Sequence, residues 1–238
     1  MAYQAVFKRY ELKYMLTASQ KEALLQVMAP YMALDQYGRT TIRNIYFDTE
    51  NYRLIRRSIE KPVYKEKLRI RSYRKTEKKD KVFVELKKKY NGVVYKRRIS
   101  MPQQQAMDWI CDGTDAPDTQ IGREIEYFRN YYTGLHPAVY LSYEREAYYC
   151  KDGGDFRVTF DDHIYARQDR LSLAETADGK ALLPEGMVLM EIKTSGGIPL
   201  WMTKYLTENR IFKTTFSKYG TAYQTMIFAK DKGAYLHA

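Results

Sequence analysis

The residues best suited to chemistry are acidic and basic side chains that alternate with apolar ones. Glutamate, an apolar residue and lysine follow one another at Glu11–Lys13, Glu85–Lys87 and Glu191–Lys193, and Arg69–Arg71 repeats the spacing with two cations. In an extended chain, residues two apart point to the same face, so each segment presents a charged face opposite an apolar one. Arginine and lysine suit phosphate oxygens, whereas these glutamates either hold Mg²⁺ or Mn²⁺ or pair with neighbouring lysines.

The positive charge of the chain is concentrated in one segment. The 238 residues include 40 Lys and Arg against 29 Asp and Glu, a net charge of +11. Residues 61–100 alone hold 16 Lys and Arg against 4 Asp and Glu, a net charge of +12, so the rest of the chain nets −1. This concentration predicts a localised site for a nucleic acid, an anionic lipid surface or a small phosphate-rich ligand. The alternative is a basic surface that faces water and binds nothing.

The composition excludes several classes of protein. With 45% hydrophobic and 29% charged residues, the chain is neither disordered nor collagen-like. No apolar run reaches the ~18 residues of a membrane-spanning helix, and charges interrupt residues 1–9 before a secretory signal could form. Two cysteines and three histidines argue against a disulfide framework and a zinc site. We therefore expect a single cytoplasmic domain over residues 1–238, without an integral membrane segment.

The hydrophobic periodicity predicts an α+β fold. Alternation marks eight strands, most of them antiparallel, and the Asn91–Gly92 dipeptide predicts a hairpin turn. Apolar residues three and four apart mark amphipathic helices between the strands. The strands are expected at residues 6–16, 41–48, 65–73, 81–90, 93–100, 138–147, 156–165 and 188–194, and the helices at 17–32, 51–58, 102–111, 121–135, 200–209 and 217–228.

The arrangement of these elements predicts where the charges lie. If the amphipathic helices cover the apolar face of the sheet, the charged faces of all strands share the other side. Closing the sheet removes its edges and encloses that side, which predicts a closed eight-stranded antiparallel β-barrel with helices packed outside. Cations crowded inside a barrel repel one another, so the excess of Lys and Arg predicts a bound polyanion. Phosphate groups fit these side chains best.

The ordered set of short motifs resembles the VTC-type polyphosphate polymerase domain of the triphosphate tunnel metalloenzyme (CYTH-like) superfamily. The resemblance extends from about Arg9 to Tyr223, nearly the whole chain. Each motif alone is weak, but their order is specific. The motifs are Arg9–Tyr14, Asn44–Asp48, Leu68–Tyr73, Glu85–Lys87, Tyr143–Arg145, Glu191–Lys193 and Phe216–Tyr219.

The resemblance implies a tunnel that is open at both ends and lined with Arg, Lys and Glu. Family members move the γ-phosphate of ATP onto a growing polyphosphate chain and release ADP, with Mn²⁺ or Mg²⁺ as the cofactor. ATP and polyphosphate are therefore the expected partners. In the fifth and sixth strands, the family pattern favours Lys96 and Arg98 over Arg97, and Tyr143 and Arg145 over the neighbouring glutamates.

The candidate site residues follow from this resemblance and from the alternating strand faces. The expected catalytic residues are Lys13, Arg69, Arg71, Lys87, Arg145, Lys193 and Lys218. The expected phosphate-binding residues are Arg9, Lys96, Arg98, Tyr143, Arg157 and Ser217. The expected metal ligands are Glu191, Glu85 and Glu11. For Ser217, capping of the last helix is the alternative to a hydrogen bond to phosphate.

We expect the protein to depart from the eukaryotic arrangement of the family, in which an SPX regulatory domain precedes this domain and transmembrane helices follow it. We expect a free-standing catalytic domain, whose regulatory or membrane partner the sequence does not identify. A triphosphatase and a non-catalytic polyphosphate-binding module remain alternatives. Nucleic-acid binding by residues 61–100, with Tyr64, Tyr73, Phe83 and Tyr90 as stacking groups, is disfavoured because the strict alternation turns the cations inward.

Overall fold

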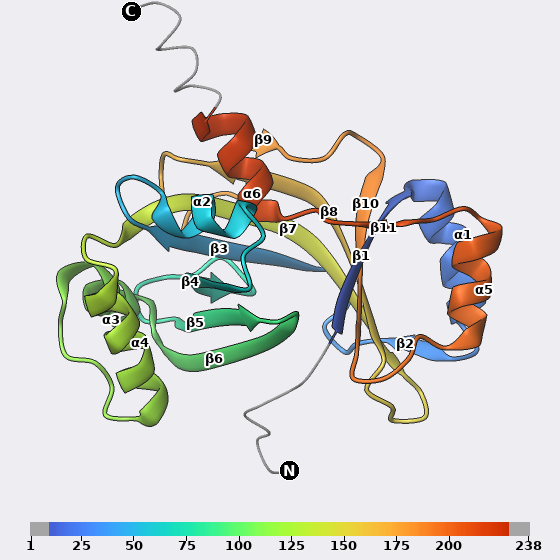
Figure 1. Cartoon of the computed structure of the whole chain (residues 1–238), viewed down its shortest axis with the longest axis horizontal. Helices are drawn as coiled ribbons and strands as arrows, with labels where there is room; N and C mark the ends of the chain where they lie inside the picture. The colour runs from blue at the N-terminus through green and yellow to red at the C-terminus, as the bar shows by residue number, and fades with distance from the viewer. Residues whose placement is uncertain (1–9, 229–238) are drawn as a thin grey trace, which may run out of the picture.

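The computed structural model describes residues 10–228 and is built around one antiparallel sheet of eleven strands (Figure 1). The strands follow in the order β11-β1-β10-β8-β7-β3-β4-β5-β6, while β2 pairs with β7 and β9 pairs with β8. Eight strands are long and correspond to the eight that the alternation predicts. The long strands are β1 (Tyr10–Thr17), β3 (Thr40–Asp48), β4 (Tyr64–Ser72), β5 (Lys81–Tyr90), β6 (Val93–Pro102), β7 (His136–Cys150), β8 (Arg157–Arg167) and β10 (Met187–Thr194), and the short ones are β2 (Met32–Leu34), β9 (Lys180–Ala181) and β11 (Lys213–Thr214).

The sheet curls so strongly that strands far apart in its order meet across one face. Strands β1 and β5 are six strand spacings apart, which in a flat sheet would separate them by about 29 Å. Nevertheless, the Lys87 Nζ atom of β5 lies 2.8 Å from a carboxylate oxygen of Glu11 on β1. The sheet therefore has a concave face, toward which both side chains point, and a convex face.

The sheet is not closed, so the prediction of a closed eight-stranded barrel is wrong. Among residues 10–228, no ladder joins β6 to β1. The physical reason lies at the outer edge of β1, where Lys13 pairs with Thr214 and Tyr14 with Lys213 of β11. Part of the edge that β6 would need is therefore already hydrogen-bonded. The ion pair between Lys87 and Glu11 joins the two borders instead.

Helices cover the convex face in two groups (Figure 1). One group packs on β3 to β6 around Trp109, Ile125 and Phe128, and the other packs on β1, β8 and β10 around Leu24 and Met202. These two apolar cores explain why the charges lie on the other side. The first group comprises α3 (Gln103–Met107), a π-helical turn (Asp108–Asp112) and α4 (Gln120–Tyr131), and the second comprises α1 (Ala18–Met28) and α5 (Leu200–Glu208).

A third apolar core lies on the concave face at one end. It packs α2 (Arg53–Ile59), α6 (Lys218–Ala222) and the π-helical turn that continues α6 (Tyr223–Ile227) against β3, β7, β8 and β10. Figure 1 shows α2 and α6 side by side over these strands. Consequently, the concave face is not charged along its whole length, and α6 starts where the charged part begins.

Helix α1 begins as predicted and ends earlier than expected. Thr17 and Gln20 form the predicted capping box, in which each side chain binds the other's backbone N–H. The helix ends at Met28 rather than near residue 32, because Pro30 has no backbone N–H with which to continue the helical hydrogen bonds, although Ala29 before it still has helical dihedral angles. Tyr31 is consequently 46% exposed instead of buried, and Met32 starts the short strand β2.

Candidate functional site

One buried carboxylate gathers four cations from three neighbouring strands. The ladders place Arg69 opposite Glu85 and Glu85 opposite Arg98. Glu85 is 1% exposed, and its oxygens lie 2.8 Å from Arg69, 2.6 Å from Lys96, 3.2 Å from Arg98 and 3.8 Å from Arg71. Burial alone would raise the pKa of Glu85, but the surrounding cations outweigh it and hold this pKa well below its usual range. We call this group the Glu85 cluster.

A second cluster lies across the concave face, on β1, β7, β8, β10 and α6. The Arg145 guanidinium donates two hydrogen bonds of 2.6 Å to the two oxygens of Asp161, and the Lys218 amine lies 2.5 Å from the same carboxylate. Glu191 is farther from its cations: Arg145 and Lys193 are at 3.5 Å, and Lys13 and Lys218 are at 3.4 Å. We call these six residues the Asp161–Glu191 cluster.

In this second cluster, the charge of each side chain shifts the pKa values of its neighbours. Burial would raise the pKa of Glu191, but Lys218, Lys13 and Lys193 together hold it well below its usual range. For Lys218, burial acts to lower the pKa, while Asp161 and Glu191 outweigh it and raise it. Both groups are therefore charged at neutral pH, and the cluster is a buried network of paired ions.

Glu11 on β1 links the two sides of the concave face by pairing with Lys87 on β5. Its carboxylate oxygens accept hydrogen bonds of 2.8 and 3.1 Å from Lys87. Burial acts to raise the pKa of Glu11, but the charges of Lys87 and Lys193 lower it to about 2. Burial also lowers the pKa of Lys193 to about 8, although Glu191 opposes this shift. Charges from both borders of the sheet are thus close enough to act on each other.

Lys67 occupies the part of the charged face that lacks an anion. Its amine donates a 3.2 Å hydrogen bond to the Ser217 hydroxyl, and no carboxylate of residues 10–228 lies within ion-pair distance of it. Burial lowers the pKa of Lys67 to about 7, and the charges of Lys13, Lys87 and other cations act in the same direction. A bound anion would supply the missing counter-charge here.

Neutral side chains fix the direction of the guanidinium groups. Arg71 donates hydrogen bonds of 2.9 Å to Asn44 and to the Tyr143 hydroxyl, and Arg69 donates one of 2.9 Å to the Tyr46 hydroxyl. Asn44 and Tyr46 lie on β3, beside the strand that carries the arginines, and Tyr143 lies on β7, the strand beyond β3. The guanidinium groups are therefore oriented before any ligand binds.

The charged face carries a large formal excess of positive charge. Its side chains are linked to one another by ion pairs, hydrogen bonds or direct electrostatic influence. They include four carboxylates and eleven cations, an excess of seven. The carboxylates are Glu11, Glu85, Asp161 and Glu191, and the cations are Lys13, Lys65, Lys67, Arg69, Arg71, Lys87, Lys96, Arg98, Arg145, Lys193 and Lys218.

The structure brings most of the predicted site residues together on this face. Arg157 stands apart, because it is exposed at the first position of β8, opposite Lys193 in the ladder. Arg9 lies outside the described residues. Ser217 caps α6, since its hydroxyl accepts a 3.3 Å hydrogen bond from the Gly220 N–H.

The two choices that the family pattern settled agree with the observed faces. Glu144 and Glu146 point away from Arg145: the first accepts a 2.7 Å hydrogen bond from Thr41, and the second pairs with Lys21 of α1 at 2.5 Å. In β6, Arg97 pairs at 2.9 Å with Glu124 of α4 on the convex side. Lys96 and Arg98 instead reach Glu85 on the concave side.

Sequence reasoning missed several residues of the charged face. Asp161, like Glu85, is a buried carboxylate with close contacts to cations, which we call an anchor. Lys65 and Lys67 continue the row of Arg69 and Arg71 along β4. The signal for the two lysines was present, since Lys65, Lys67, Arg69 and Arg71 alternate with other residues. Asn44 and Tyr46 lie within the motif Asn44–Asp48, but nothing in the spacing of its residues indicates that they orient arginines.

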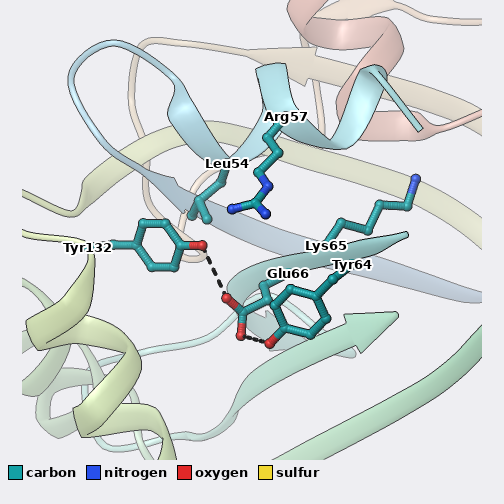
Figure 2. A pocket seen from close by; sticks show the side chains of 6 residues that line it. All are labelled: Leu54, Arg57, Tyr64, Lys65, Glu66 and Tyr132. Atoms are coloured by element: carbon teal, nitrogen blue, oxygen red, sulfur yellow. Dashed lines mark hydrogen bonds between the residues drawn. The ribbon is translucent and has the colours of Figure 1, made fainter. Parts of the chain in front are cut away.

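A small cavity lies under α2, between this helix and β4. Its volume is about 10 Å³, which suits about one water molecule, and Figure 2 shows its lining side chains. Glu66 points away from the concave face and accepts hydrogen bonds from the hydroxyls of Tyr64, at 2.5 Å, and Tyr132, at 3.1 Å. Burial and the Glu66 charge raise the pKa of Tyr132 to about 12. This cavity is a structural junction between β4 and the helices, too small for a substrate.

Across residues 10–228, no helix is both long and apolar enough to cross a membrane.

Two solved structures share the fold. HpAC1 from Hippeastrum, a candidate adenylyl cyclase described as having a dominant triphosphatase activity, has a TM-score of 0.57 and 16% identity, with coverage of 91% of this chain and 95% of that one. A candidate adenylate cyclase from Bacillus halodurans has a TM-score of 0.54 and 14% identity, with coverage of 89% and 96%. The chain therefore shares the fold of these two proteins.

The family follows from the sequence itself. No curated protein sequence matches the chain. The model of the VTC domain matches residues 8–227, which include every long strand and the whole charged face. This protein belongs to the VTC domain family.

Proposed function

We propose that this protein is a polyphosphate polymerase that transfers the γ-phosphate of ATP to the end of a polyphosphate chain and releases ADP. The observation that carries the proposal is the excess of eleven cations over four carboxylates on one face of a curled sheet. Such an excess is unfavourable without a bound polyanion of high charge density. Membership of the VTC domain family supports phosphoanhydride substrates.

The arginines and lysines have distinct roles in this proposal. Arg69, Arg71 and Arg145 are held by carboxylates or hydroxyls and present fixed forks to phosphate oxygens. Lys13, Lys87, Lys96, Arg98 and Lys193 neutralise the remaining charge of the triphosphate and of the product chain. Preorganised positive charge stabilises the negative oxygens of the transferred group without reorganisation during the reaction.

A divalent cation fits Glu191 better than the other carboxylates. The four cations around Glu191 lie at 3.4 or 3.5 Å, and such long contacts leave oxygen lone pairs for another ligand. Glu85 and Asp161 have cations at 2.5–2.8 Å, which favours ion pairing as their role. No three Asp, Glu, His or Cys side chains of residues 10–228 form a metal cluster, so oxygens of the phosphates would complete the coordination.

In this assignment Glu191, with Glu11 nearby, would hold Mn²⁺ or Mg²⁺. When bound, the cation neutralises phosphate charge and polarises the transferred phosphoryl group. The acceptor phosphate is already a nucleophile, so the chain needs no general base. Its task is to align the acceptor, the γ-phosphate and the leaving ADP. The Ser217 hydroxyl accepts from Gly220 and Lys67, which leaves its hydrogen available to a phosphate oxygen.

A triphosphatase is the second candidate. It would use the same charged face with water as the acceptor, and the activity described for HpAC1, which shares the fold, favours it. Incubation with ATP and Mn²⁺, followed by gel electrophoresis stained for polyphosphate, separates the two. We expect a ladder of phosphate chains together with ADP. Release of orthophosphate alone would establish the triphosphatase instead.

The same assay tests whether the face is catalytic or only binds. Glu191→Gln should lower turnover about 10³-fold while the protein still binds tripolyphosphate. Glu124→Gln is the matched control, since this glutamate pairs with Arg97 on the convex side. It should leave turnover unchanged. Binding without turnover in the wild-type protein would identify a non-catalytic polyphosphate-binding module.

The contacts of residues 61–100 argue against a nucleic-acid partner. The Arg98 guanidinium lies 3.5 Å from the centre of the Phe83 ring and 5.4 Å from that of Tyr73, so a cation already covers these stacking groups. The other arginines of β4 and β6 face the concave side or pair with α4. Binding to duplex DNA with a steep dependence on salt concentration would contradict this expectation.

A further inference from the structure

The motif Asn44–Asp48 ends in a buried carboxylate that the proposed chemistry does not use. Asp48 is 0% exposed at the end of β3. One of its oxygens accepts backbone N–H bonds from Thr49 at 2.9 Å and Leu54 at 2.8 Å. The other accepts one from Ile55 at 3.0 Å and a 2.9 Å bond from the Tyr219 hydroxyl. Asp48 therefore ties β3, the start of α2 and a residue of α6 together.

Tyr219 connects this carboxylate to the charged face. Its ring stacks on Tyr46 with centroids 4.8 Å apart, and the Tyr46 hydroxyl accepts the hydrogen bond from Arg69. Tyr219 directly follows Ser217 and Lys218 in the chain. The position of its ring thus determines where the first turn of α6 lies relative to β3 and β4.

Helix α6 needs such an external tie. It has five residues, and even with the five residues of the π-helical turn that continues it, the segment is shorter than the ~12 residues that an isolated helix needs in water. Yet its first turn must hold the Lys218 amine 2.5 Å from Asp161 and 3.4 Å from Glu191, and the Ser217 hydroxyl 3.2 Å from Lys67. Small shifts of the backbone would break these contacts.

We infer that Asp48 is a positioning residue, which acts through the Tyr219 hydroxyl to set Lys218 and Ser217 against the charged face. A carboxylate suits this role, because both oxygens must accept from two donors each, which an amide nitrogen of asparagine cannot do. The inference connects two separate motifs, Asn44–Asp48 and Phe216–Tyr219, through one side-chain hydrogen bond. Its consequence for ligand binding rests on the proposed function, whereas its structural part does not.

Tyr219→Phe isolates the tie, because it removes one hydroxyl and keeps the ring on Tyr46. Tyr205→Phe is the matched control, since its hydroxyl donates a 3.0 Å bond to the Gln20 carbonyl between α1 and α5, away from the charged face. We expect amide hydrogen exchange in Lys218–Ala222 to become about tenfold faster in Tyr219→Phe and to stay unchanged in Tyr205→Phe. Wild-type exchange in Tyr219→Phe would overturn the inference.

Tripolyphosphate affinity, measured by calorimetry, tests the consequence for the site. Tyr219→Phe should weaken binding about tenfold, and Tyr205→Phe should not change it. In a Lys218→Gln background, Tyr219→Phe should add about twofold or less, because its effect passes through Lys218. Full additivity would overturn the positioning role, since a merely structural loss would not depend on Lys218. If the wild-type protein does not bind tripolyphosphate, the proposed function fails, and hydrogen exchange alone decides the inference.

Discussion

The Glu85 cluster and the Asp161–Glu191 cluster both neutralise cations of the concave face with carboxylates, but their carboxylates differ in how closely they contact those cations. Around Glu85, one carboxylate of 1% exposure serves four cations, three of them at 2.6–3.2 Å. Across the concave face, Asp161 takes the close contacts at 2.5 and 2.6 Å, and Glu191 is left with contacts of 3.4 and 3.5 Å. The comparison shows that a charged face can contain rigid anchors and one loosely paired carboxylate whose oxygens can accept another ligand.

The strongest test of this difference is to neutralise each carboxylate in turn and measure stability. Glu85→Gln should reduce the free energy of unfolding by about 3 kcal/mol, because four cations lose the buried anion that they share. Glu191→Gln should cost only about 1 kcal/mol, since its contacts are long. Chemical denaturation of both variants measures these values. Equal losses would remove the distinction between anchor and loosely paired carboxylate.

A bound polyanion should compensate for the negative charge that is lost in the Glu85→Gln variant. Tripolyphosphate at a hundred times its dissociation constant stabilises a folded protein by about 2.7 kcal/mol. We expect its effect on the melting temperature to be larger in Glu85→Gln than in the wild-type protein, because the variant presents more uncompensated charge. Thermal unfolding with and without the ligand measures this. A smaller shift in the variant would mean that Glu85 is needed to arrange the binding cations.

Lys67 belongs to neither cluster and allows a test by pH. With its pKa lowered to about 7, its amine is mostly neutral at pH 8 in the free protein. A bound polyanion favours the protonated form of Lys67 and also those of Lys96 and Lys193, whose pKa values are lowered to about 8, so binding at pH 8 should take up protons, with the largest share by Lys67, and should weaken as pH rises from 7 to 9. Calorimetry in two buffers of different ionisation enthalpy measures this uptake.

The Lys67→Gln variant should bind tripolyphosphate about tenfold more weakly and lose the largest single share of the proton uptake. Lys88→Gln is the control, because Lys88 lies on the other face of β5 near Glu66, at 3.7 Å. Unchanged proton uptake in Lys67→Gln would show that another group titrates.

The last test concerns the ion pair between Lys87 and Glu11, which links β5 to β1. The pKa of Glu11 is lowered from 4.5 to about 2 in the folded protein, so its contribution to stability is fully present above pH 4.5 and is lost as pH falls toward 2. Glu11→Gln should therefore flatten the loss of stability between pH 4.5 and 2. Denaturation curves across this range measure the slope, and an identical slope in the variant would contradict the assignment.

Sequence alone was enough to predict the long strands and the side of the sheet on which the charges lie. Alternation with a period of two is a local property, so Arg69, Arg71 and Glu85 could be placed on one face without knowledge of the fold. The choice between Tyr143 with Arg145 and the neighbouring glutamates could not be made this way, because both pairs alternate equally well.

The closure of the sheet and the second anchor lay beyond local patterns. Strand β11 has only two residues, Lys213–Thr214, too few for any periodicity, yet it occupies part of the edge that closure requires. Asp161 becomes an anchor because Arg145, opposite it on β7, and Lys218, 57 residues further along the chain, both reach it. Such contacts depend on tertiary packing rather than on residue spacing.

The ion pair between Lys87 and Glu11 is open to dissolved ions. The two side chains are 36% and 23% exposed, so salt screens their attraction. Because this pair links β1 to β5 across the concave face, we expect a rise in ionic strength to weaken this link as well as the contacts to a polyanion. Small-angle scattering across a salt series, without a ligand, would show whether the curvature of the sheet changes when the link weakens.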